Sequence, residues 1–395
     1  MPAVLAHVRG LRDRFIRGSI ELSHSLGDDF IAGRARFLDA NTIEVNGRRV
    51  TAERIILATG SRPIVPAPWR SLGRRVLSTD DFFEQPDLGR RVAVIGLGAI
   101  GAELGQGLAM LGLEVHGFSH SGQLAGITDS EVNAALLEAL QGELRLTTGV
   151  EVQLEAADEH AVRVIAGAET HEVDWVLAAI GRRPNLDDIG LENLGVALDA
   201  HGMPAFDRAT LQLADLPIWL AGDANRLHPI LHEAADDGRL AAHHALQEGA
   251  DCHRRRAPMG IVFTQPNAAF AGKRRRELDE ADIVVGKVSY ARQGRALTEG
   301  RNAGALHVYF DRTSMKLLGA ELAAPDGEHL AHLLAWAIQQ ELSIDQLLQM
   351  PFYHPVVEEG LRSALHDARR QLPQARPLID LPLCAPPPAW ALGAD

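Results

Sequence analysis

The sequence predicts an α/β fold followed by a separate α+β domain. The first observation is a buried strand, RVAVI at 91–95, that leads through the glycine-rich turn GLGAIG into an amphipathic helix. A second apolar run, WVLAAIG at 175–181, completes this α/β unit as another buried strand. From residue 258 the pattern changes to strands followed by helices, which is typical of an α+β domain.

The composition is that of an ordinary globular protein with two or three domains, at about 150 residues each. Of the 395 residues 46% are hydrophobic, so a large core can form without disulfides or a structural metal. Acidic residues number 52 against 39 lysines and arginines, and the net charge is −13. This balance argues against nucleic acid or an anionic membrane as the main partner. No apolar run approaches the ~18 residues of a membrane span.

Cysteine and histidine spacing predicts no bound metal. Cys252 and Cys384 belong to no C-x-x-C pair or zinc pattern, so they predict free thiols in a reducing cytoplasm. This excludes a secreted disulfide scaffold. Four histidines lack the spacing of an H-E-x-x-H site, and we interpret them as surface or packing residues. They are His228, His232, His243 and His244.

Ahead of the glycine turn, the sequence predicts a helix, short strands and a connection. Apolar residues at helical spacing predict a helix over residues 4–26. Alternating runs on either side of Asn46-Gly47 predict a hairpin, because this pair suits a tight turn. Residues 62–89 are rich in Pro, Asp and Arg and are typical of a connection between domains. Later helices are expected at about 129–141, 231–247 and 356–371.

The G-x-G-x-x-G turn has the context of a dinucleotide-binding site, with a strand before it and a helix after it. Gly96 permits the tight turn, Gly98 lets the backbone approach a pyrophosphate, and Gly101 lets the helix pack on the strand. The phosphates would lie at the positive N-terminus of this helix. The next strand ends in Ser119-His120, where an NAD-binding protein would have an acid, so the choice between NAD and NADP stays open.

Two more apolar strands end in glycine-containing turns. The segment PIWLAGD ends in Asp223, whose carboxylate can accept hydrogen bonds from the hydroxyl groups of a ligand or cap the next helix. The segment IILATGSRP at 55–63 would by itself indicate only a turn.

These features occur together, and in this order, in the flavoprotein pyridine nucleotide-disulfide oxidoreductases. The chain resembles that family from about residue 1 to residue 372, most closely its dihydrolipoyl dehydrogenase branch. The resemblance implies a two-dinucleotide-binding flavoprotein with a Rossmann-like NAD(P) domain, inserted in a truncated FAD domain, and a C-terminal α+β dimerisation domain. The matching segments are ATGSRP at 58–63, VIGLGAIGAELG at 94–105, AAIGRRPN at 178–185, WLAGDAN at 219–225 and FYHPVVEEG at 352–360.

The resemblance also implies two cofactors, FAD and NAD(P), and assigns residues to each. Asp223 would hold ribityl or ribose hydroxyls of FAD, and Glu103 would lie near the nicotinamide end of NAD(P). The residues assigned to FAD are Thr59, Gly60, Ser61, Gly222, Asp223, Pro229, Ile230, Leu231 and His232. The residues assigned to NAD(P) are Gly96, Gly98, Gly101, Glu103 and Gly181.

The sequence HPVVEE at 354–359 suggests an acid–base pair. Pro355 blocks a helix at His354 and can begin the next one, so His354 would be presented from a loop. A carboxylate bonded to one ring nitrogen fixes the tautomer and favours proton transfer near neutral pH. The resemblance assigns this pair to His354 and Glu359, reaching across a homodimer to the partner's active site, and gives Glu358 no role. The simpler interpretation is a loop histidine beside acids that favour a helix N-terminus.

The same resemblance predicts five parts along the chain. The remaining FAD-binding domain would be 1–89 and its return segment 206–256, with the NAD(P)-binding domain at 90–205. The dimerisation domain would be 257–372 and the tail 373–395. Family members begin with an FAD fingerprint and a redox-active cysteine pair, and the sequence contains neither. We expect an N-terminally truncated reductase; the alternative is a naturally short protein without disulfide chemistry.

The predicted function is FAD-dependent electron transfer between NAD(P)H and a small or protein-bound dithiol or disulfide, of the dihydrolipoyl dehydrogenase type. The alternatives are a flavin reductase without the disulfide, such as a transhydrogenase or NAD(P)H oxidase, and a non-catalytic NAD(P)-binding remnant. The His–Glu pair favours the first, because it serves a thiol. We expect a cytoplasmic homodimer with no nucleic-acid or membrane partner.

Overall fold

The computed structural model describes residues 1–158, 160–247, 253–372 and 381, which divide into two compact units. Unit 1 combines Met1–Gly96 with Glu151–Arg255, and unit 2 combines Leu97–Val150 with Arg256–Asp395. Cys252, Cys384 and the predicted tail, apart from Leu381, lie outside the described residues. Across the described ranges, no helix combines the length and the apolar character needed to cross a membrane. The finer division into five parts stays a prediction.

Unit 1 begins with the long helix α1, Pro2–Ser25, close to the predicted 4–26. Proline suits the first turn because its missing N–H has no partner there in any helix. Arg9 ties this helix to the rest of the unit by donating to the carbonyls of Phe83 and Gln85 at 2.8 and 3.0 Å. The predicted hairpin is confirmed: Asn46 and Gly47 both have positive φ and join β2 (Thr42–Val45) to β3 (Arg48–Thr51).

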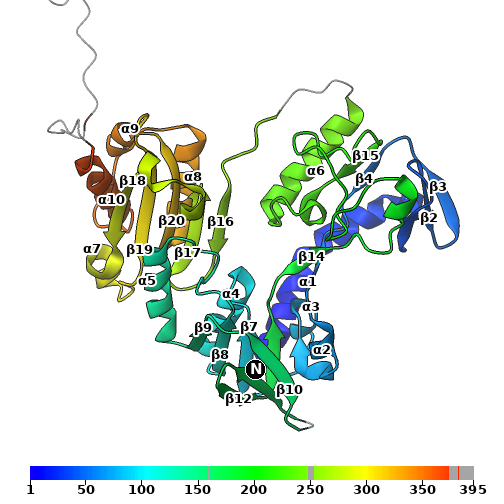
Figure 1. Cartoon of the computed structure of the whole chain (residues 1–395), viewed down its shortest axis with the longest axis horizontal. Coiled ribbons are helices and arrows are strands. Elements are labelled where there is room, and N and C mark those ends of the chain that lie inside the picture. Colours follow the sequence, from blue (N-terminus) through cyan, green and yellow to red (C-terminus); the bar gives the residue numbers. More distant parts are fainter. Residues whose placement is uncertain (159, 248–252, 373–380, 382–395) are drawn as a thin grey trace, which may run out of the picture. The chain divides into compact units, whose positions relative to one another are not determined.

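A parallel pair of short strands forms the framework for one of the sites in unit 1. Strand β4 (Ile55–Leu57) lies beside β15 (Ile218–Leu220), so the two glycine-containing turns leave the same end of the pair. Leu57 and Leu220 are buried on one face. Trp219 points to the other face, where it packs with buried alanines of α6 (Leu231–Leu246). Figure 1 shows α6 beside β4 and β15.

A second parallel group in unit 1 contains the strand before the glycine turn. Strand β13 (Trp175–Ala178) lies between β6 (Val76–Leu77) and β7 (Arg91–Ile95). Strands β7 and β13 are each buried on both faces of the sheet, as their continuous apolar runs predicted. Residues 62–89, predicted as a connection, contain several short elements. Among them, α3 (Thr79–Phe82) begins with a capping box between Ser78 and Asp81.

The remaining elements of unit 1 are short strands and two short helices. They are β1 (Ala35–Phe37), β5 (Ser61–Pro63), α2 (Ala67–Arg70), α3 (Thr79–Phe82), β10 (Val152–Ala156), β11 (Val162–Ala166), β12 (Glu169–Val173) and β14 (Arg182–Pro184).

Unit 2 is built on an antiparallel sheet with the strand order β16 (Met259–Val262), β17 (Asn267–Gly272), β20 (Leu317–Ala324), β19 (Ala305–Asp311) and β18 (Ile283–Ser289). Residues such as Leu306, Val308 and Leu322 form an apolar core on one face, with α8 (Gly327–Gln339) and α10 (Glu359–Arg370) packed over it. Figure 1 shows both helices beside this sheet. The alternate residues His307, Tyr309 and Glu321 point to the opposite face, as the two-residue period of a strand requires.

The elements of this sheet domain and of the preceding segment complete unit 2. They are α4 (Ala99–Met110), β8 (Glu114–Ser119), α5 (Ser130–Gln141), β9 (Arg145–Thr148), β16 (Met259–Val262), β17 (Asn267–Gly272), β18 (Ile283–Ser289), α7 (Gly294–Thr298), β19 (Ala305–Asp311), β20 (Leu317–Ala324), α8 (Gly327–Gln339), α9 (Ile344–Leu348) and α10 (Glu359–Arg370).

The last helix begins later than the sequence predicted. A helix was expected from residue 356, whereas α10 begins at Glu359. The reason is a local bond: the backbone N–H of Val356 donates to Oε2 of Glu359 at 3.2 Å and holds the intervening residues in a turn. The Glu359 carboxylate therefore closes the turn in front of its own helix.

Candidate cofactor and proton-transfer sites

The turns after β4 and β15 meet through Ser61 and Asp223. The backbone N–H of Ala221 donates to the carbonyl of Leu57 at 3.0 Å, which aligns the two strand ends. The Ser61 hydroxyl then donates to Oδ2 of Asp223 at 2.7 Å. Asp223 lies in a short 3₁₀ turn, Gly222–Asn225, and α6 instead takes Ile230 as its N-cap. The interpretation of Asp223 as a helix cap is therefore wrong.

The buried carboxylate of Asp237, on α6, holds the Gly222–Asn225 turn in place through hydrogen bonds. Oδ2 of Asp237 accepts the N–H of Gly222 at 3.0 Å and the side-chain amide of Asn225 at 2.6 Å. Its other oxygen accepts from Arg255 at 2.6 Å. Sequence reasoning missed Asp237, although Glu233 and Asp237 lie four residues apart among the buried alanines of α6. An acidic pair on an apolar helix face is the signal that could have found it.

The AAIGRRPN segment lies beside the ATGSRP segment, as β14 pairs antiparallel with β5. Arg182 donates to the hydroxyl of Ser61 at 2.9 Å and to its carbonyl at 2.8 Å. Asn185 donates to the carbonyl oxygens of Thr59 and Gly60, at 3.0 and 2.9 Å. Gly181, with a φ of 121°, accepts from Ile64 just before this pair of strands. Sequence reasoning assigned no role to Arg182 or Asn185.

The polar groups of this turn suit a ligand rich in hydroxyl groups. Within the described chain Asp223 uses Oδ2 for Ser61, which leaves Oδ1 to accept from a ligand. The residues predicted for the flavin side, Pro229 to His232, open α6, and Leu231 is 86% exposed. His232 lies near Glu233, while His243 and His244 pack edge-on with each other and with His253. Of these groups, Oδ1 of Asp223 is the acceptor that fits a sugar hydroxyl of FAD.

The dinucleotide turn has the backbone geometry that its glycines predicted. Gly96 has a φ of 93°, and a Cβ there would lie 2.4 Å from the carbonyl oxygen of Ala179. Gly98 is the N-cap of α4, and a Cβ on it would meet open space. Gly101 is buried in the first turns of α4. The open backbone at Gly98 and the N-terminus of α4 fit an approaching pyrophosphate.

Two acids close in sequence to the glycine turn, Glu103 and Asp129, differ in how far the protein itself occupies their carboxylate oxygens. Oε1 of Glu103, on α4, accepts the backbone N–H of Phe263 at 2.7 Å. Asp129, the acid that follows Ser119-His120, is buried and caps α5 through the N–H groups of Glu131 and Val132. Its other oxygen lies 2.7 Å from Nδ1 of His307 and 3.0 Å from the Tyr309 hydroxyl. Asp129 is thus occupied by the protein itself.

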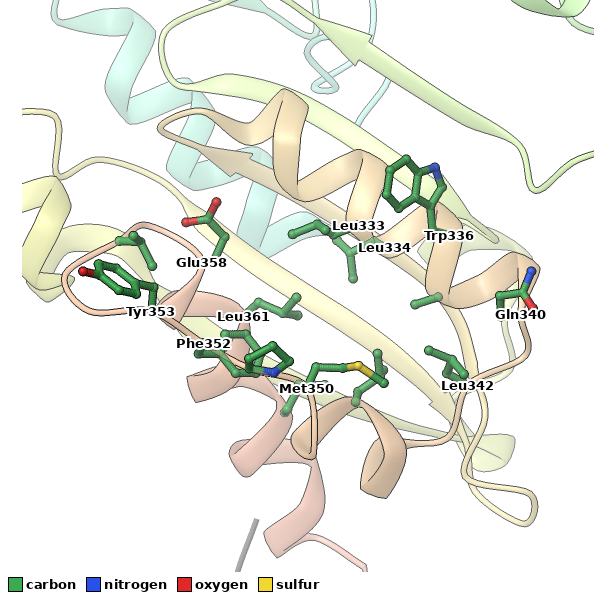
Figure 2. A pocket seen from close by; sticks show the side chains of 15 residues that line it. Leu333, Leu334, Trp336, Gln340, Leu342, Met350, Phe352, Tyr353, Glu358 and Leu361 are labelled. Atoms are coloured by element: carbon green, nitrogen blue, oxygen red, sulfur yellow. The ribbon is translucent and has the colours of Figure 1, made fainter. Parts of the chain in front are cut away.

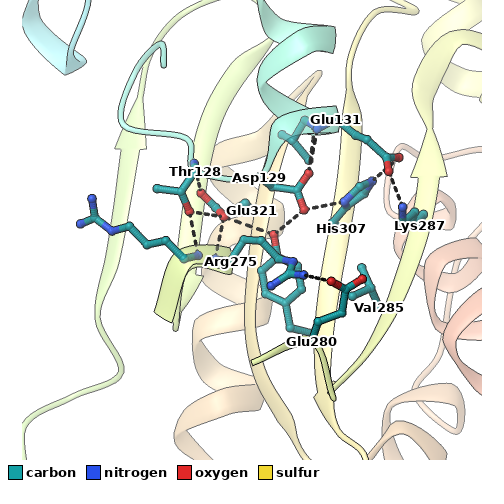
Figure 3. Close-up of polar contacts among 12 residues, drawn as sticks. Thr128, Asp129, Glu131, Arg275, Glu280, Val285, Lys287, His307 and Glu321 are labelled. Carbon is teal, nitrogen blue, oxygen red and sulfur yellow. Dashed lines mark hydrogen bonds and ion pairs between the residues drawn. The ribbon is translucent and has the colours of Figure 1, made fainter. Parts of the chain in front are cut away.

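Figure 3 shows how this contact continues across the sheet. Glu321, fully buried on β20, accepts the hydroxyl of Thr128 at 2.9 Å, the N–H of Arg275 at 2.9 Å and the Tyr309 hydroxyl at 3.2 Å. The Tyr309 hydroxyl therefore lies between two carboxylates, those of Asp129 and Glu321, and burial beside them raises its pKa. Sequence reasoning missed this network, because its members lie on separate elements.

The predicted acid–base pair is assembled on the loop before α10. Nδ1 of His354 lies 2.9 and 3.1 Å from the two carboxylate oxygens of Glu359. The hydrogen bond from His354 lowers the pKa of Glu359. The His354 side chain is 81% exposed, so its other ring nitrogen faces solvent and can exchange a proton with an incoming group.

An apolar cavity of about 460 Å³ lies beside this loop, on the surface of unit 2. Figure 2 shows its lining, which comes from α8, α9, the segment before α10 and the first turns of α10. Trp336 is 66% exposed and Tyr353, next to His354, is 79% exposed. Exposed large aromatic side chains beside an apolar cavity are typical of an interface with another chain.

Family comparisons identify the class of this chain. Residues 13–249 match the family model of pyridine nucleotide-disulphide oxidoreductases, and residues 259–365 match the dimerisation domain of the same family. A dihydrolipoyl dehydrogenase of Thermus scotoductus is 31% identical over 353 residues, covering 87% of this chain and 76% of that protein. The chain therefore belongs to the pyridine nucleotide-disulphide oxidoreductase family, whose members use FAD and NAD(P)H.

Other relatives extend the comparison. A mercuric reductase of Staphylococcus aureus is 30% identical over 353 residues, and the chain spans 64% of that protein's length. The crystal structure of LpdA from Mycobacterium tuberculosis matches with a TM-score of 0.79 at 25% identity, covering 94% of this chain and 83% of the other. These matches confirm the predicted fold class, an FAD- and NAD(P)-binding α/β part followed by an α+β dimerisation domain.

Proposed function

We propose that the chain catalyses FAD-dependent electron transfer between NAD(P)H and a dithiol or disulfide, a reaction of the dihydrolipoyl dehydrogenase type. The observation that carries the proposal is the hydrogen-bonded pair of His354 and Glu359. An exposed imidazole with one nitrogen held by a carboxylate is suited to accept a thiol proton. Similarity to a dihydrolipoyl dehydrogenase supports the same substrate class.

His354 acts as the base when the dithiol is oxidised. Two S–H bonds break, one S–S bond forms, a hydride equivalent reduces NAD⁺ to NADH, and one proton is released. The solvent-facing nitrogen of His354 takes a thiol proton, and Glu359 stabilises the imidazolium that results. In the reverse direction the same nitrogen returns the proton to the thiolate.

The cofactors are assigned to the two glycine-containing regions. Asp223, fixed by Ser61, would bind sugar hydroxyls of FAD, and the backbone from Gly96 to Gly98 would bind the pyrophosphate of NAD(P). Gly101, Glu103 and Gly181 are assigned to NAD(P) as well. Pro229 to His232 would lie on the flavin side, with Thr59, Gly60 and Gly222. FAD, when bound, supplies the redox chemistry, and the chain supplies position and proton transfer.

A second copy of the chain is the proposed occupant of the apolar cavity on unit 2. The dimerisation-family match covers residues 259–365, which include the cavity lining. Trp336 and Tyr353 would become buried in such a dimer, and His354 would lie at its edge. We place the dimer in the cytoplasm, because the spacing of the two cysteines in the sequence predicts free thiols.

The purified chain can be titrated with FAD and then assayed with NAD⁺ and dihydrolipoamide. We expect flavin absorbance that stays with the protein, dihydrolipoamide oxidation, and a loss of about a hundredfold or more in kcat for His354→Gln. The matched control is His329→Gln, an exposed histidine beside Glu328 on α8, which should keep full activity. Flavin binding with NADH oxidation but no dithiol oxidation would restrict the chain to flavin reductase chemistry. Absence of flavin binding would overturn the proposal.

The dimer has its own test, in sedimentation equilibrium. We expect the mass of two chains for the wild type and of one chain for Trp336→Glu, because a buried charge without a partner opposes association. Phe15→Glu, at another exposed aromatic, is the control and should remain dimeric. A wild-type monomer at assay concentration would contradict the dimer and leave the acid–base assignment to the kinetic experiment.

A further inference from the structure

Gln106 on α4 is a buried amide whose hydrogen-bonding groups are all used. It is 2% exposed. Its Nε2 donates to the carbonyl of Gln265 at 2.8 Å and to Oε2 of Glu143 at 2.9 Å, and its Oε1 accepts the N–H of Gln265 at 2.7 Å. A side chain that binds both groups of one residue's backbone fixes that residue in position and orientation.

The turn at residues 264–267, which Gln106 contacts at Gln265, is also stabilised by hydrogen bonds of its own. The hydroxyl of Thr264 is buried and donates to the carbonyl of Pro266 at 2.8 Å. The side-chain amide of Asn267 donates to the carbonyl of Thr264 at 2.7 Å. This turn is therefore held by its own bonds, and Gln106 attaches it to α4.

Glu103 lies three residues before Gln106, on the same face of α4. Its Oε1 accepts the N–H of Phe263 at 2.7 Å, two residues before Gln265. One helix face thus holds two alternate residues of the 263–265 segment. Within the described chain the Phe263 bond orients the Glu103 carboxylate and leaves Oε2 to accept from a ligand.

We propose that Gln106 is a positioning residue that orients Glu103 toward the nicotinamide end of the bound nucleotide. The inference rests on the proposed function, in which Glu103 serves that end. The ligand group that matches Oε2 is a hydrogen-bond donor such as the carboxamide N–H of nicotinamide. Loss of the Gln106 bonds would release the 263–265 segment and, with it, the N–H that orients the carboxylate.

The experiment compares two nucleotides that differ in the nicotinamide group. NADH and ADP-ribose are titrated separately into the wild type and Gln106→Met, which preserves side-chain length and removes the amide. We expect NADH to bind about tenfold more weakly to the variant, the loss of a charge-assisted bond, and ADP-ribose to bind within about twofold of the wild type. Gln153→Met, an exposed glutamine on β10, is the control and should change neither affinity.

Hydrogen exchange gives a readout that does not depend on ligand. The amides of Phe263 and Gln265 should exchange faster in Gln106→Met, whereas those of the β19–β20 ladder should not. Equal losses for NADH and ADP-ribose, or an unchanged NADH affinity, would overturn the positioning role. If the wild type bound neither nucleotide, the nucleotide site of the proposed function would fail first. If Gln106→Met did not fold, Gln106→Asn, which keeps a neutral amide but is one methylene shorter, would be tested in the same way.

Discussion

Nδ1 of His354 is bonded to both oxygens of Glu359, at 2.9 and 3.1 Å, and the same carboxylate accepts the backbone N–H of Val356 at 3.2 Å. One side chain therefore orients the imidazole and also closes the turn before α10. The pair and the loop that presents it are consequently a single structural feature. A substitution of His354 should therefore change the titration of Glu359.

Removal of the imidazole is expected to raise the pKa of Glu359. The hydrogen bond from His354 is the main cause that lowers this pKa in the folded protein. In His354→Ala the Val356 bond remains, so the pKa should move toward its usual value without reaching it. Carbon-13 NMR of the glutamate carboxyls across an acid titration measures this directly. An unchanged Glu359 titration would contradict the observed pair, and His329→Ala provides the control.

The lowered pKa of Asp129 leads us to expect that the free energy of unfolding decreases in acid. Burial raises the pKa of Asp129, but the hydrogen bond and charge of His307 outweigh it and lower the pKa from 3.8 to about 2. A carboxyl with a lowered folded pKa stabilises the protein above its unfolded pKa, and that stability is lost as the pH falls toward the folded value. The Asp129 contribution is about 2 kcal/mol at neutral pH, of which about half is lost by pH 3.

Urea unfolding of the wild type and Asp129→Asn at several pH values tests this. The free-energy gap between the two proteins should be constant from pH 7 to about pH 5 and should narrow by about 1 kcal/mol at pH 3. A gap that stays constant down to pH 3 would show that Asp129 has an ordinary pKa in the folded state.

Two buried tyrosines allow a matched comparison of hydroxyl groups. The Tyr309 hydroxyl lies 3.0 Å from Asp129 and 3.2 Å from Glu321, whereas that of Tyr290 has a longer bond of 3.3 Å to the carbonyl of Val357. Both rings are fully buried. We expect Tyr309→Phe to lower the free energy of unfolding by about 1.5–3 kcal/mol, and Tyr290→Phe by about 1 kcal/mol or less. Equal losses in urea unfolding would mean that the carboxylates do not depend on Tyr309.

Elements with a long, regular pattern could be predicted from the sequence. The helices α1 and α6, the strand β7 and the hairpin at Asn46-Gly47 all lie where periodicity and turn residues indicated. The elements within residues 62–89 were missed, because strands of two or three residues have no measurable period. The start of α10 was misplaced because Glu359 binds backwards to Val356, a contact that propensity does not encode.

The site could be predicted only in part, for a similar reason. The family resemblance assigned Ser61 and Asp223 to the same cofactor; the structure shows a hydrogen bond between them, and their role in binding FAD stays a prediction. The supporting groups, such as Arg182, Asp237 and Gln106, are single polar side chains whose partners are distant in the sequence. Each has an ordinary local context, and only the folded chain shows what it holds.

Gly96 and Gly98, in the same turn, are expected to be needed for different reasons: Gly96 for the backbone conformation and Gly98 for ligand binding. At Gly96 a side chain would require a left-handed φ of 93° and would place Cβ 2.4 Å from the carbonyl of Ala179. Gly98 has an ordinary φ of −68°, and its Cβ would meet open space. Gly96→Ala should therefore destabilise the fold by about 2–4 kcal/mol, because the backbone of Ala179 must shift.

Gly98→Ala should instead leave the free energy of unfolding within about 1 kcal/mol of the wild type, since the new methyl group meets no protein atom. Its effect should appear in nucleotide binding, because a methyl group at the helix N-terminus keeps the pyrophosphate from the backbone. Thermal unfolding and titration with ADP-ribose measure the two effects separately. ADP-ribose binding that is unchanged in Gly98→Ala would place the pyrophosphate elsewhere, whereas a Gly96→Ala protein as stable as the wild type would contradict the close approach to Ala179.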